Sequence, residues 1–321
     1  MEINKIIRSK VMLAPMAGIT DFVLRSLIRE YSAGALLTTE MISSEGLTQV
    51  KDTVITKLTE KHHPISYQLS GHKPEMIAKC AKYLEQFADC IDINMGCPVN
   101  KVVKGQDGSA LMKNPELASD IVKAVKDAVN IPVTVKIRLG YTADSMNYIP
   151  FAQKMQEAGA ELVTLHARTR AQLYSGKADW NHIKLLKENV DIPVFANGDI
   201  NSVEDAIRCF ELTNADGVAI ARGMLGDVTL ISRIEHWVKT GEILPKPEIS
   251  ENIKNMIKHL NEEIELRGKE VGMKFVRKFY PYYVNGFKNA AKIREKLITS
   301  DDYDEVIGIL NMIAGKELVL N

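Results

Sequence analysis

Short apolar runs alternate with helical patterns eight times along the first roughly 235 residues of the chain. The apolar runs are expected to be strands, and they lie at residues 11–15, 35–39, 65–68, 90–93, 133–137, 162–165, 193–196 and 217–221. Several of the helices expected between them begin at a capping signal, such as Asn114 before Pro115, or Ser202 with Asp205 three residues later. This rhythm predicts a TIM (β/α)8 barrel, an α/β fold of typically about 250 residues, rather than an open doubly wound sheet.

The remainder of the chain is expected to form a separate helical unit. Pro245 and Pro247 mark a linker, and helices are predicted at residues 251–266, 269–283, 288–297 and 302–314. We therefore expect a TIM-barrel domain over residues 1–244 and a C-terminal all-α helical bundle domain over residues 245–321. No apolar run approaches the ~18 residues of a membrane span, so no membrane segment is expected, and the protein is expected to be monomeric.

Charge is balanced overall, with 41 basic against 41 acidic residues, so nucleic-acid binding would require a local basic patch. The stretch from Arg267 to Lys296 is such a patch, because it contains nine basic residues, including Lys288 and Lys292, against only two glutamates. Its sign bias favours contact with an RNA backbone over a merely solvated face. Six aromatic residues are interleaved with it and are interpreted mainly as bundle core, with base stacking as the alternative: Phe275, Phe279, Tyr280, Tyr282, Tyr283 and Phe287.

Four cysteines without a C-x-x-C pair or a secretory leader indicate a reducing, cytoplasmic environment. Disulfides and zinc are poor interpretations, and the histidines lack the spacing of a metal site, so no metal is expected. Cys80, Cys90 and Cys209 fall inside predicted helices or at a strand start and are interpreted as core residues. Cys97 differs, because it lies on a turn after a predicted strand, between Gly96 and Pro98.

Catalysis in a TIM barrel takes place at the carboxyl ends of its strands, which makes the residues just after each predicted strand the candidates. Each of these positions carries a polar or conformationally special group: Met16 with Gly18, Glu40, Gln68, Asn94 with Cys97, Lys136 with Arg138, His166 with Arg168, Asn197 with Asp199, and Arg222 with Gly223.

Lys136 lies within an otherwise apolar strand, where an ammonium group has little reason to be unless an anion awaits it. A functional role is favoured, and the alternative is a structural pair with Glu40 or Asp92. His166 is either a core histidine or, slightly favoured, a residue at the rim beside a polar or anionic ligand.

The loops after the seventh and eighth strands are those that commonly bind phosphate in this fold. Asn197, Gly198 and Asp199 form the first loop, and Arg222 with Gly223 forms the second. Glycines allow backbone N–H groups to approach an anion, an arginine offers a planar fork, and a helix expected to begin near Met224 would add its positive end. These loops predict a phosphate site.

Cys97 is interpreted as a proton donor. A thiol is mostly protonated at neutral pH, which suits an acid, whereas a nucleophile would need its pKa lowered. No histidine lies near Cys97 in the sequence to lower it.

Together these motifs resemble the flavin-dependent tRNA dihydrouridine synthases of the bacterial type. The resemblance covers nearly the whole barrel, and the run around Cys97 is its most specific part. The residues that carry it are Ala14 to Gly18 with Thr20 and Asp21, Gln68, Asn94 to Pro98 with Lys101, Gly105, Gly108 and Ala110, Lys136, Arg138 and Gly140, His166 to Thr169, Asn197 to Asp199, and Arg222 with Gly223.

The resemblance implies an enzyme that binds FMN and uses NADPH to reduce the 5,6 double bond of a specific uridine in tRNA. It places the flavin over Pro15, Met16, Ala17 and Gly18, with Gln68, Lys136 and His166 around its ring and Asn197, Gly198, Asp199, Arg222 and Gly223 at its phosphate. Cys97 would protonate C5 of the base, Asn94 and Arg168 would hold the nucleotide, and the C-terminal helices with Lys288 and Lys292 would contact the tRNA.

Two other functions remain open at this point. One is an FMN barrel oxidoreductase acting on a free small molecule, similar to dihydroorotate dehydrogenases, which would leave the basic helices unexplained. The other is a non-catalytic RNA-binding protein built on a barrel.

Overall fold

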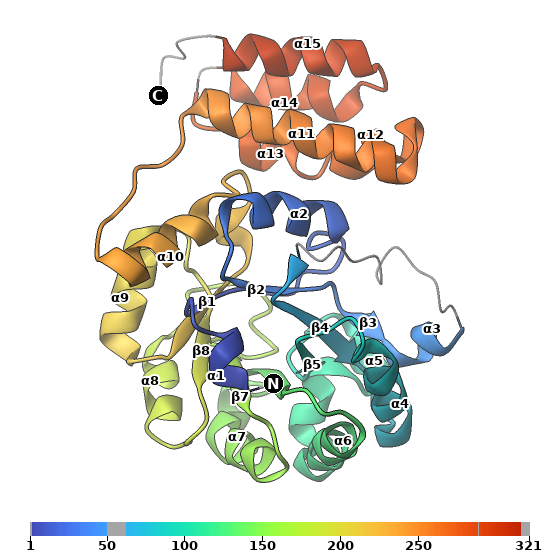
Figure 1. The fold of residues 1–321 in the computed structure, drawn as a ribbon, viewed down its shortest axis with the longest axis vertical. Coiled ribbons are helices and arrows are strands. Elements are labelled where there is room, and N and C mark those ends of the chain that lie inside the picture. The colour runs from blue at the N-terminus through green and yellow to red at the C-terminus, as the bar shows by residue number, and fades with distance from the viewer. Residues whose placement is uncertain (1, 50–61, 288, 316–321) are drawn as a thin grey trace.

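The computed structural model describes residues 2–49, 62–287 and 289–315, and in these ranges the strands form one parallel sheet with helices outside it (Figure 1). The sheet closes into an eight-stranded barrel in the order β1-β2-β4-β5-β6-β7-β8-β9, because β2 pairs with β4 and β9 pairs with β1. A short strand, β3 (Ile42–Ser43), adds to β4 at the rim. The predicted TIM barrel is therefore confirmed.

The barrel strands are β1 (Val11–Leu13), β2 (Leu36–Thr38), β4 (Ile65–Ser70), β5 (Cys90–Asn94), β6 (Val133–Arg138), β7 (Leu162–His166), β8 (Val194–Asn197) and β9 (Gly217–Ile220). The helices around them are α2 (Phe22–Tyr31), α4 (Pro74–Leu84), α6 (Pro115–Ala128), α7 (Tyr148–Glu157), α8 (Asn181–Lys187), α9 (Val203–Thr213) and α10 (Leu230–Thr240). Shorter helical pieces are α3 (Ser44–Gln49), α5 (Asn100–Lys104) and the 3-10 turns η3 (Gly108–Lys113), η4 (Ala143–Ser145) and η5 (Arg222–Met224).

Helix starts follow the capping signals in the sequence. The Asn114 side chain accepts a hydrogen bond from the backbone N–H of Leu117, and Ser202 does the same for Asp205. Asp21 caps α2 by accepting from the N–H of Leu24. These contacts place the helix starts within a residue or two of the predicted positions.

The amino-terminal end of the barrel is closed by helix α1 (Ile3–Ile6). Ile3 and Ile6 form one buried apolar cluster with the inward-facing Leu36, Cys90, Leu162 and Phe195 of four strands. A second and larger cluster fills the layer between the strands and the outer helices. Because the lower half of the barrel is packed with apolar side chains, polar groups concentrate at the opposite, carboxyl end.

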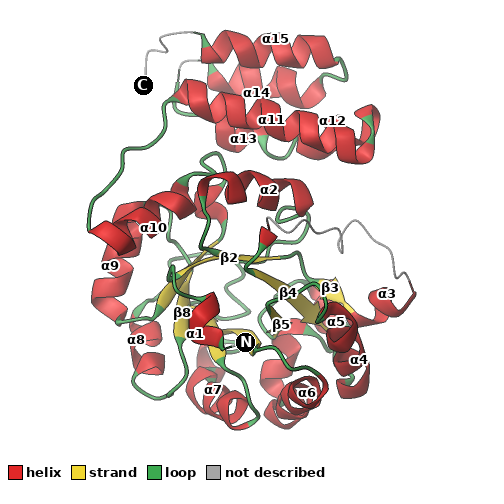
Figure 2. Ribbon diagram, in the orientation of Figure 1, coloured by secondary structure: helices red, strands yellow, loops and turns green. Residues whose placement is uncertain are grey.

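The C-terminal helices stack as a bundle beside the barrel (Figure 2). They are α11 (Ile249–Arg267), α12 (Lys269–Val276), α13 (Tyr280–Tyr283), α14 (Ala290–Thr299) and α15 (Tyr303–Ala314), and α11 packs against α12, α15 and the barrel helix α2. The single helix predicted for residues 269–283 is wrong: it breaks after Val276, because Pro281 cannot continue a helix and instead begins α13. Helix α10 ends at Thr240, and we place the domain boundary in the loop before α11.

Most of the aromatic residues in these helices are buried, as the core interpretation predicted. Phe279, Tyr280, Tyr283 and Phe287 are at most 6% exposed, whereas Tyr282 is 40% exposed. Among the described residues, no helix is both long and apolar enough to cross a membrane.

Candidate active site at the carboxyl ends of the strands

A cavity of about 380 Å³ opens at the carboxyl ends of the barrel strands. It brings together thirteen of the sequence-predicted residues: Pro15, Met16, Ala17, Gln68, Asn94, Cys97, Lys136, His166, Asn197, Gly198, Asp199, Arg222 and Gly223. Gly18, Arg168 and Lys292 do not line it, and Lys288 lies outside the described residues. Residues from seven different strand ends thus meet at one site, as the barrel topology requires.

A buried hydrogen-bond chain forms the floor of this cavity. Asp92 accepts from the Thr134 hydroxyl (2.6 Å) and from Nε2 of Gln68 (2.7 Å), and Oε1 of Gln68 accepts from Nδ2 of Asn94 (2.8 Å). Burial raises the pKa of Asp92, and the hydrogen bonds from Thr134 and Gln68 oppose that rise together with the charge of Lys136. The chain fixes the Asn94 and Gln68 amides in one orientation, because each polar atom has a defined partner.

Asn94 positions Cys97. Its Oδ1 accepts from the backbone N–H of Gly96 (3.2 Å) and of Cys97 (2.9 Å), which shapes the turn after β5. On the other side, the Cys97 carbonyl accepts from the N–H of Ser109 (3.1 Å), and Gly108 packs so closely that an added Cβ would lie 2.9 Å from that carbonyl oxygen. The thiol is half-buried and faces the cavity from a doubly anchored turn.

Lys136 extends from β6 into the cavity. Its Nζ donates to Oδ1 of Asn197 (3.0 Å), and Nδ2 of Asn197 donates to the carbonyl of Ala219. Neither Glu40 nor Asp92 forms an ion pair with it within the described chain, and Glu40 instead accepts from the N–H of Gly18. Burial, aided by the charge of Arg138, lowers the pKa of Lys136 to about 8. The alternative, a structural ion pair, is therefore not found among the described residues, and the ammonium lines the cavity without a carboxylate partner there.

His166 is held neutral. Burial lowers its pKa well below the ordinary value, and the positive charges of Lys136, Arg138, Arg168 and Arg222 lower it further. A neutral imidazole among cations can donate or accept a hydrogen bond, but it adds no charge to the cavity.

Arg168 and Asp199 form a buried ion pair instead of facing a ligand. Nη2 of Arg168 lies 2.9 and 2.7 Å from the two carboxylate oxygens of Asp199 and also donates to the carbonyl of Gly176. The Arg168 side chain is only 2% exposed, and the Asp199 carboxylate additionally accepts from the N–H of Ala178. Both side chains hold the loop, although the Asp199 side chain is 31% exposed and Asp199 also lines the cavity.

The two predicted phosphate loops touch each other. A Cβ added at Gly223 would lie 2.2 Å from the carbonyl oxygen of Ile200, so only glycine allows this approach. Gly198 has φ +118°, and a Cβ there would meet Ala178 at 2.8 Å and the His166 ring at 3.0 Å. The helix expected near Met224 is wrong: a 3-10 turn ends there, and α10 begins only at Leu230.

Arg138 and Tyr174 also line the site: the sequence indicated Arg138 as a strand-end candidate without a specific role, and it did not indicate Tyr174. Arg138 donates to the carbonyls of Gly96 (2.9 Å), Thr169 and Leu173 (both 2.8 Å), so it ties the Cys97 turn to the loop after β7. Burial lowers its pKa to about 10. Tyr174 lines the cavity and is 52% exposed. The position of Arg138 at a strand end was a usable signal, whereas Tyr174 lies in an irregular loop that shows no pattern.

The C-terminal helices hold the loop that carries Pro15 to Asp21. Lys278 donates to the carbonyl of Gly18 and lies 3.2 Å from the centre of the Phe275 ring. Arg267 donates to Asp21 (2.7 Å) and to Glu263 (2.5 Å). Much of the predicted basic patch is therefore engaged in structural contacts.

Asp21, Glu263 and the buried His259 also bring donor atoms within 4.8 Å of one another, a grouping that could hold a metal ion. Arg267 donates to both carboxylates and thus already supplies one positive charge at this position. Lys292 is exposed on α14 and remains available to a partner.

Comparison with known proteins identifies the family. A family model described as dihydrouridine synthase matches residues 12–315. A Synechocystis protein named "Probable tRNA-dihydrouridine synthase 1" is 43% identical over 301 residues, which cover 93% of this chain and 84% of that protein. The "Probable tRNA-dihydrouridine synthase" of Rickettsia bellii is 38% identical over 96% of this chain and 97% of its own length, and "tRNA-dihydrouridine synthase B" of Shewanella oneidensis is 40% identical over 87% of each. The chain belongs to the dihydrouridine synthase family.

Proposed function

We propose that this chain reduces the C5–C6 double bond of a specific uridine in tRNA to dihydrouridine, with FMN as its bound cofactor and NADPH as the reductant. The observation that carries the proposal is the convergence of Cys97, Lys136 and two glycine-containing loops on one cavity, in a chain of the dihydrouridine synthase family. Family membership argues against an enzyme specific for dihydroorotate and against a non-catalytic barrel.

The residues around the cavity fit a flavin mononucleotide. The volume of about 380 Å³ falls within the ~300–1,000 Å³ typical of small-ligand sites. Pro15, Met16 and Ala17 offer an apolar and backbone surface for a flat ring, and Gln68 offers amide groups. Lys136 supplies a cation without a carboxylate partner, as an electron-rich ring edge requires. The loops with Gly198 and Gly223 provide backbone N–H groups for the phosphate.

When bound, FMN accepts electrons from NADPH and supplies hydride to C6 of the uracil. The protein completes the reduction: Cys97 donates the proton of its Sγ to C5, and solvent then reprotonates the thiolate. One hydride and one proton saturate the double bond, so NADPH is oxidised and uridine is reduced in equal amounts. Asn94 assists by holding the Cys97 backbone through its Oδ1.

Access for RNA is supported by Lys292 on α14 and by the open rim of the cavity. A uridine inside folded tRNA must be extruded to reach Cys97, at a cost of a few kcal/mol that contacts with the protein must offset. Arg168 is better placed to hold Asp199 than to contact the nucleotide, because its guanidinium is buried and paired.

The test is Cys97→Ala in the FMN-loaded enzyme, with Cys80→Ala as the matched control. The Cys80 thiol is buried on α4 and donates to the carbonyl of Ser44, away from the cavity. We expect Cys97→Ala to retain FMN and to be reduced by NADPH, but to form dihydrouridine in tRNA at least about 100-fold more slowly, the usual loss when a general acid is removed. Turnover equal to that of Cys80→Ala would refute the role of Cys97. A wild-type protein that binds no FMN would refute the proposed function itself.

A further inference from the structure

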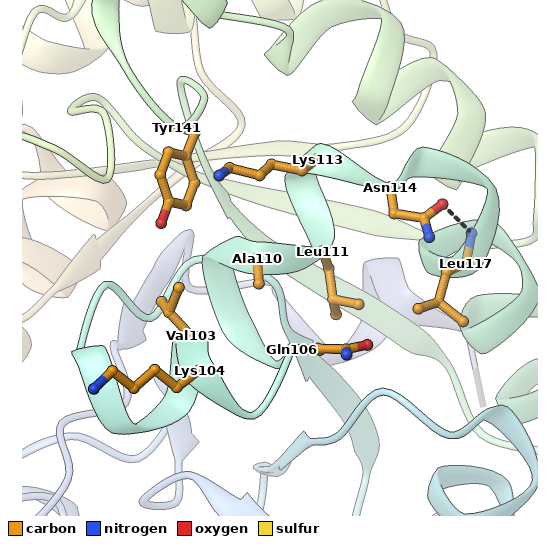
Figure 3. Close-up of a pocket in the computed structure, with 9 residues that line it drawn as sticks. All are labelled: Val103, Lys104, Gln106, Ala110, Leu111, Lys113, Asn114, Leu117 and Tyr141. Atoms are coloured by element: carbon orange, nitrogen blue, oxygen red, sulfur yellow. Dashed lines mark hydrogen bonds between the residues drawn. The ribbon is translucent and has the colours of Figure 1, made fainter.

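The segment that carries Cys97 separates two cavities. Residues from Gly96 to Val99 line the active-site cavity, whereas Val103 to Leu117 line a second cavity of about 400 Å³ together with Tyr141, from the loop after β6 (Figure 3). The two cavities are similar in volume. Gly108 of η3 packs against Cys97, and other residues of α5 and η3 line the second cavity. Nothing in the function proposed above occupies the second cavity.

Cations surround this second cavity without acidic partners. Its nine lining residues include Lys104 and Lys113 but no Asp or Glu. Both lysines are exposed, and neither forms an ion pair in the part of the chain that the structure describes. The acidic residues of the neighbouring sequence are engaged elsewhere, Asp107 with His72 and Glu116 with Lys154.

Two cationic side chains lie against the ring of Tyr141. Nζ of Lys113 lies 3.5 Å from the centre of its ring, and Figure 3 shows the Lys113 side chain directed at that ring. The guanidinium of Arg170 lies 5.0 Å from the same centre. Arg170 donates to Oδ1 of Asn100 through Nη2, but its Nε is buried and has no hydrogen-bond partner. Two cations, Lys113 and Arg170, therefore lie against one aromatic ring, and no carboxylate pairs with either among the described residues. An incoming phosphate would supply the missing counter-charge.

The loop that carries Tyr141 lies on the side of the barrel opposite the C-terminal helices. Tyr141 follows β6, which lies four places around the eight-stranded barrel from β1 in either direction. The C-terminal helices pack on α2, which follows β1. Tyr141 and the C-terminal helices are thus attached to opposite sides of the barrel; in Figure 1, α6 and α7, which flank Tyr141 in the sequence, lie at the bottom and the C-terminal helices at the top.

We propose that the second cavity is a phosphate-binding surface for the RNA backbone next to the uridine that enters the active site. The inference rests on the proposed function for its choice of RNA. An RNA strand whose uridine reaches Cys97 then runs past η3, which packs against Cys97, and Lys104, Lys113 and Arg170 neutralise its phosphates. Together with the C-terminal helices, this surface holds the RNA on both sides of the mouth, so it favours the extruded state of the base.

The experiment compares the double variant Lys104→Glu/Lys113→Glu with the control Lys123→Glu/Lys184→Glu in the full chain. The control removes exposed lysines of α6 and α8 and changes the net charge equally. Binding of an unmodified tRNA transcript is measured at several salt concentrations. We expect the test variant to bind at least about 10-fold more weakly at 0.1 M salt, with a slope of log affinity against log salt smaller by about 1 to 2, because each lost phosphate contact releases about one fewer counterion. The control is expected to stay within about twofold of the wild type.

Lys113→Gln is the milder variant should the double change disturb folding, and it should weaken binding about threefold. Equal affinity and slope for test and control variants would overturn the proposal. An effect confined to the KM of NADPH would also overturn the proposal, because the surface would then bind a phosphate of NADPH and not of RNA. Binding is read without turnover, so a wild type that binds tRNA but forms no dihydrouridine would contradict the proposed reaction while leaving this surface in place.

Discussion

Arg267 holds together a buried charge cluster where the C-terminal helices meet the barrel. Its guanidinium joins Asp21, which is 2% exposed, to Glu263, which is fully buried. Burial raises the pKa of Asp21 to about 7, and the adjacent Glu263 adds to the rise. Burial acts the same way on Glu263, but the neighbouring His259, Asp21 and Arg267 outweigh it and lower the pKa of that carboxyl. The pair thus carries close to one negative charge below pH 7, and Arg267 neutralises it.

The change Arg267→Met keeps much of the side-chain stem that covers the Phe275 ring but removes this cation. Removing one partner of a buried ion pair costs about 3–5 kcal/mol, and since Arg267 is 20% exposed we expect about 3 kcal/mol at pH 8. At pH 5 Asp21 is protonated with or without Arg267, so the loss should be smaller by about 1 kcal/mol, because one pH unit above a pKa of about 7 is worth about 1.4 kcal/mol.

The sign of this pH dependence follows from the direction of the Asp21 shift. An acid whose pKa is higher in the folded state contributes stability that is fully present below its unfolded pKa of 3.8 and is lost as pH rises through about 7. A shift of three units corresponds to about 4 kcal/mol over that interval. Without Arg267 the Asp21 pKa rises further, so the deficit of the variant should grow between pH 5 and pH 8.

The measurement is native-state hydrogen exchange of amides in α2 and α11 at pH 5 to 8, which reports the free energy of opening at this junction. Arg208→Met is the matched control, because Arg208 pairs with Asp205 on the surface and is 67% exposed, so its removal should cost at most about 1 kcal/mol. Arg267→Met/Asp21→Asn should recover most of the loss at pH 8, since the amide still caps α2 and carries no charge. A deficit below about 1 kcal/mol at pH 8, or one that does not depend on pH, would refute the reasoning.

Two further predictions concern lysines near the active site. Lys278→Met should weaken FMN binding several-fold by releasing the carbonyl of Gly18. Lys274→Met removes an exposed ion pair on α12, just before the turn that carries Lys278, and should leave FMN binding unchanged. Equal dissociation constants in fluorescence titrations would show that the C-terminal helices do not support the cofactor loop. Lys136→Met should raise the urea midpoint of the FMN-free protein at pH 7, because it removes a buried ammonium whose pKa is lowered to about 8. The same change should reduce turnover at least about 100-fold. A destabilised Lys136→Met protein would contradict the idea that this lysine is kept for function.

The barrel was predictable from the sequence because its signals are local. Each strand is a short apolar run, and helix starts such as Asn114 and Ser202 carry their own capping side chains. The errors have local causes as well. Pro281 interrupts a helix that hydrophobic spacing alone would continue, and the two residues of β3 are too few to show a period.

The site was predictable to the extent that topology alone decides it. Parallel strands end on the same rim, so residues after each strand had to meet, and thirteen of the chosen residues line one cavity. Topology cannot show which of those side chains already have partners within the protein. Arg168 and Lys136 both lie at the carboxyl end of a strand. Arg168 is paired with the Asp199 carboxylate, whereas Lys136, among the described residues, donates to the amide oxygen of Asn197.

That difference determines the charge of the cavity. Asp199 is cancelled by Arg168, and His166 is neutral because four cations surround its buried ring. Lys136 and Arg222 therefore remain as positive groups facing the cavity, with no carboxylate paired to either among the described residues. A cavity that keeps positive charge after all internal pairs are counted favours a ligand that is anionic or becomes electron-rich during the reaction. The proposed flavin fits this description, because its phosphate is anionic and its ring becomes electron-rich on reduction. A neutral pyrimidine alone is neither. The internal ion pairs therefore argue that the arrangement of charges suits the proposed cofactor more than the substrate base.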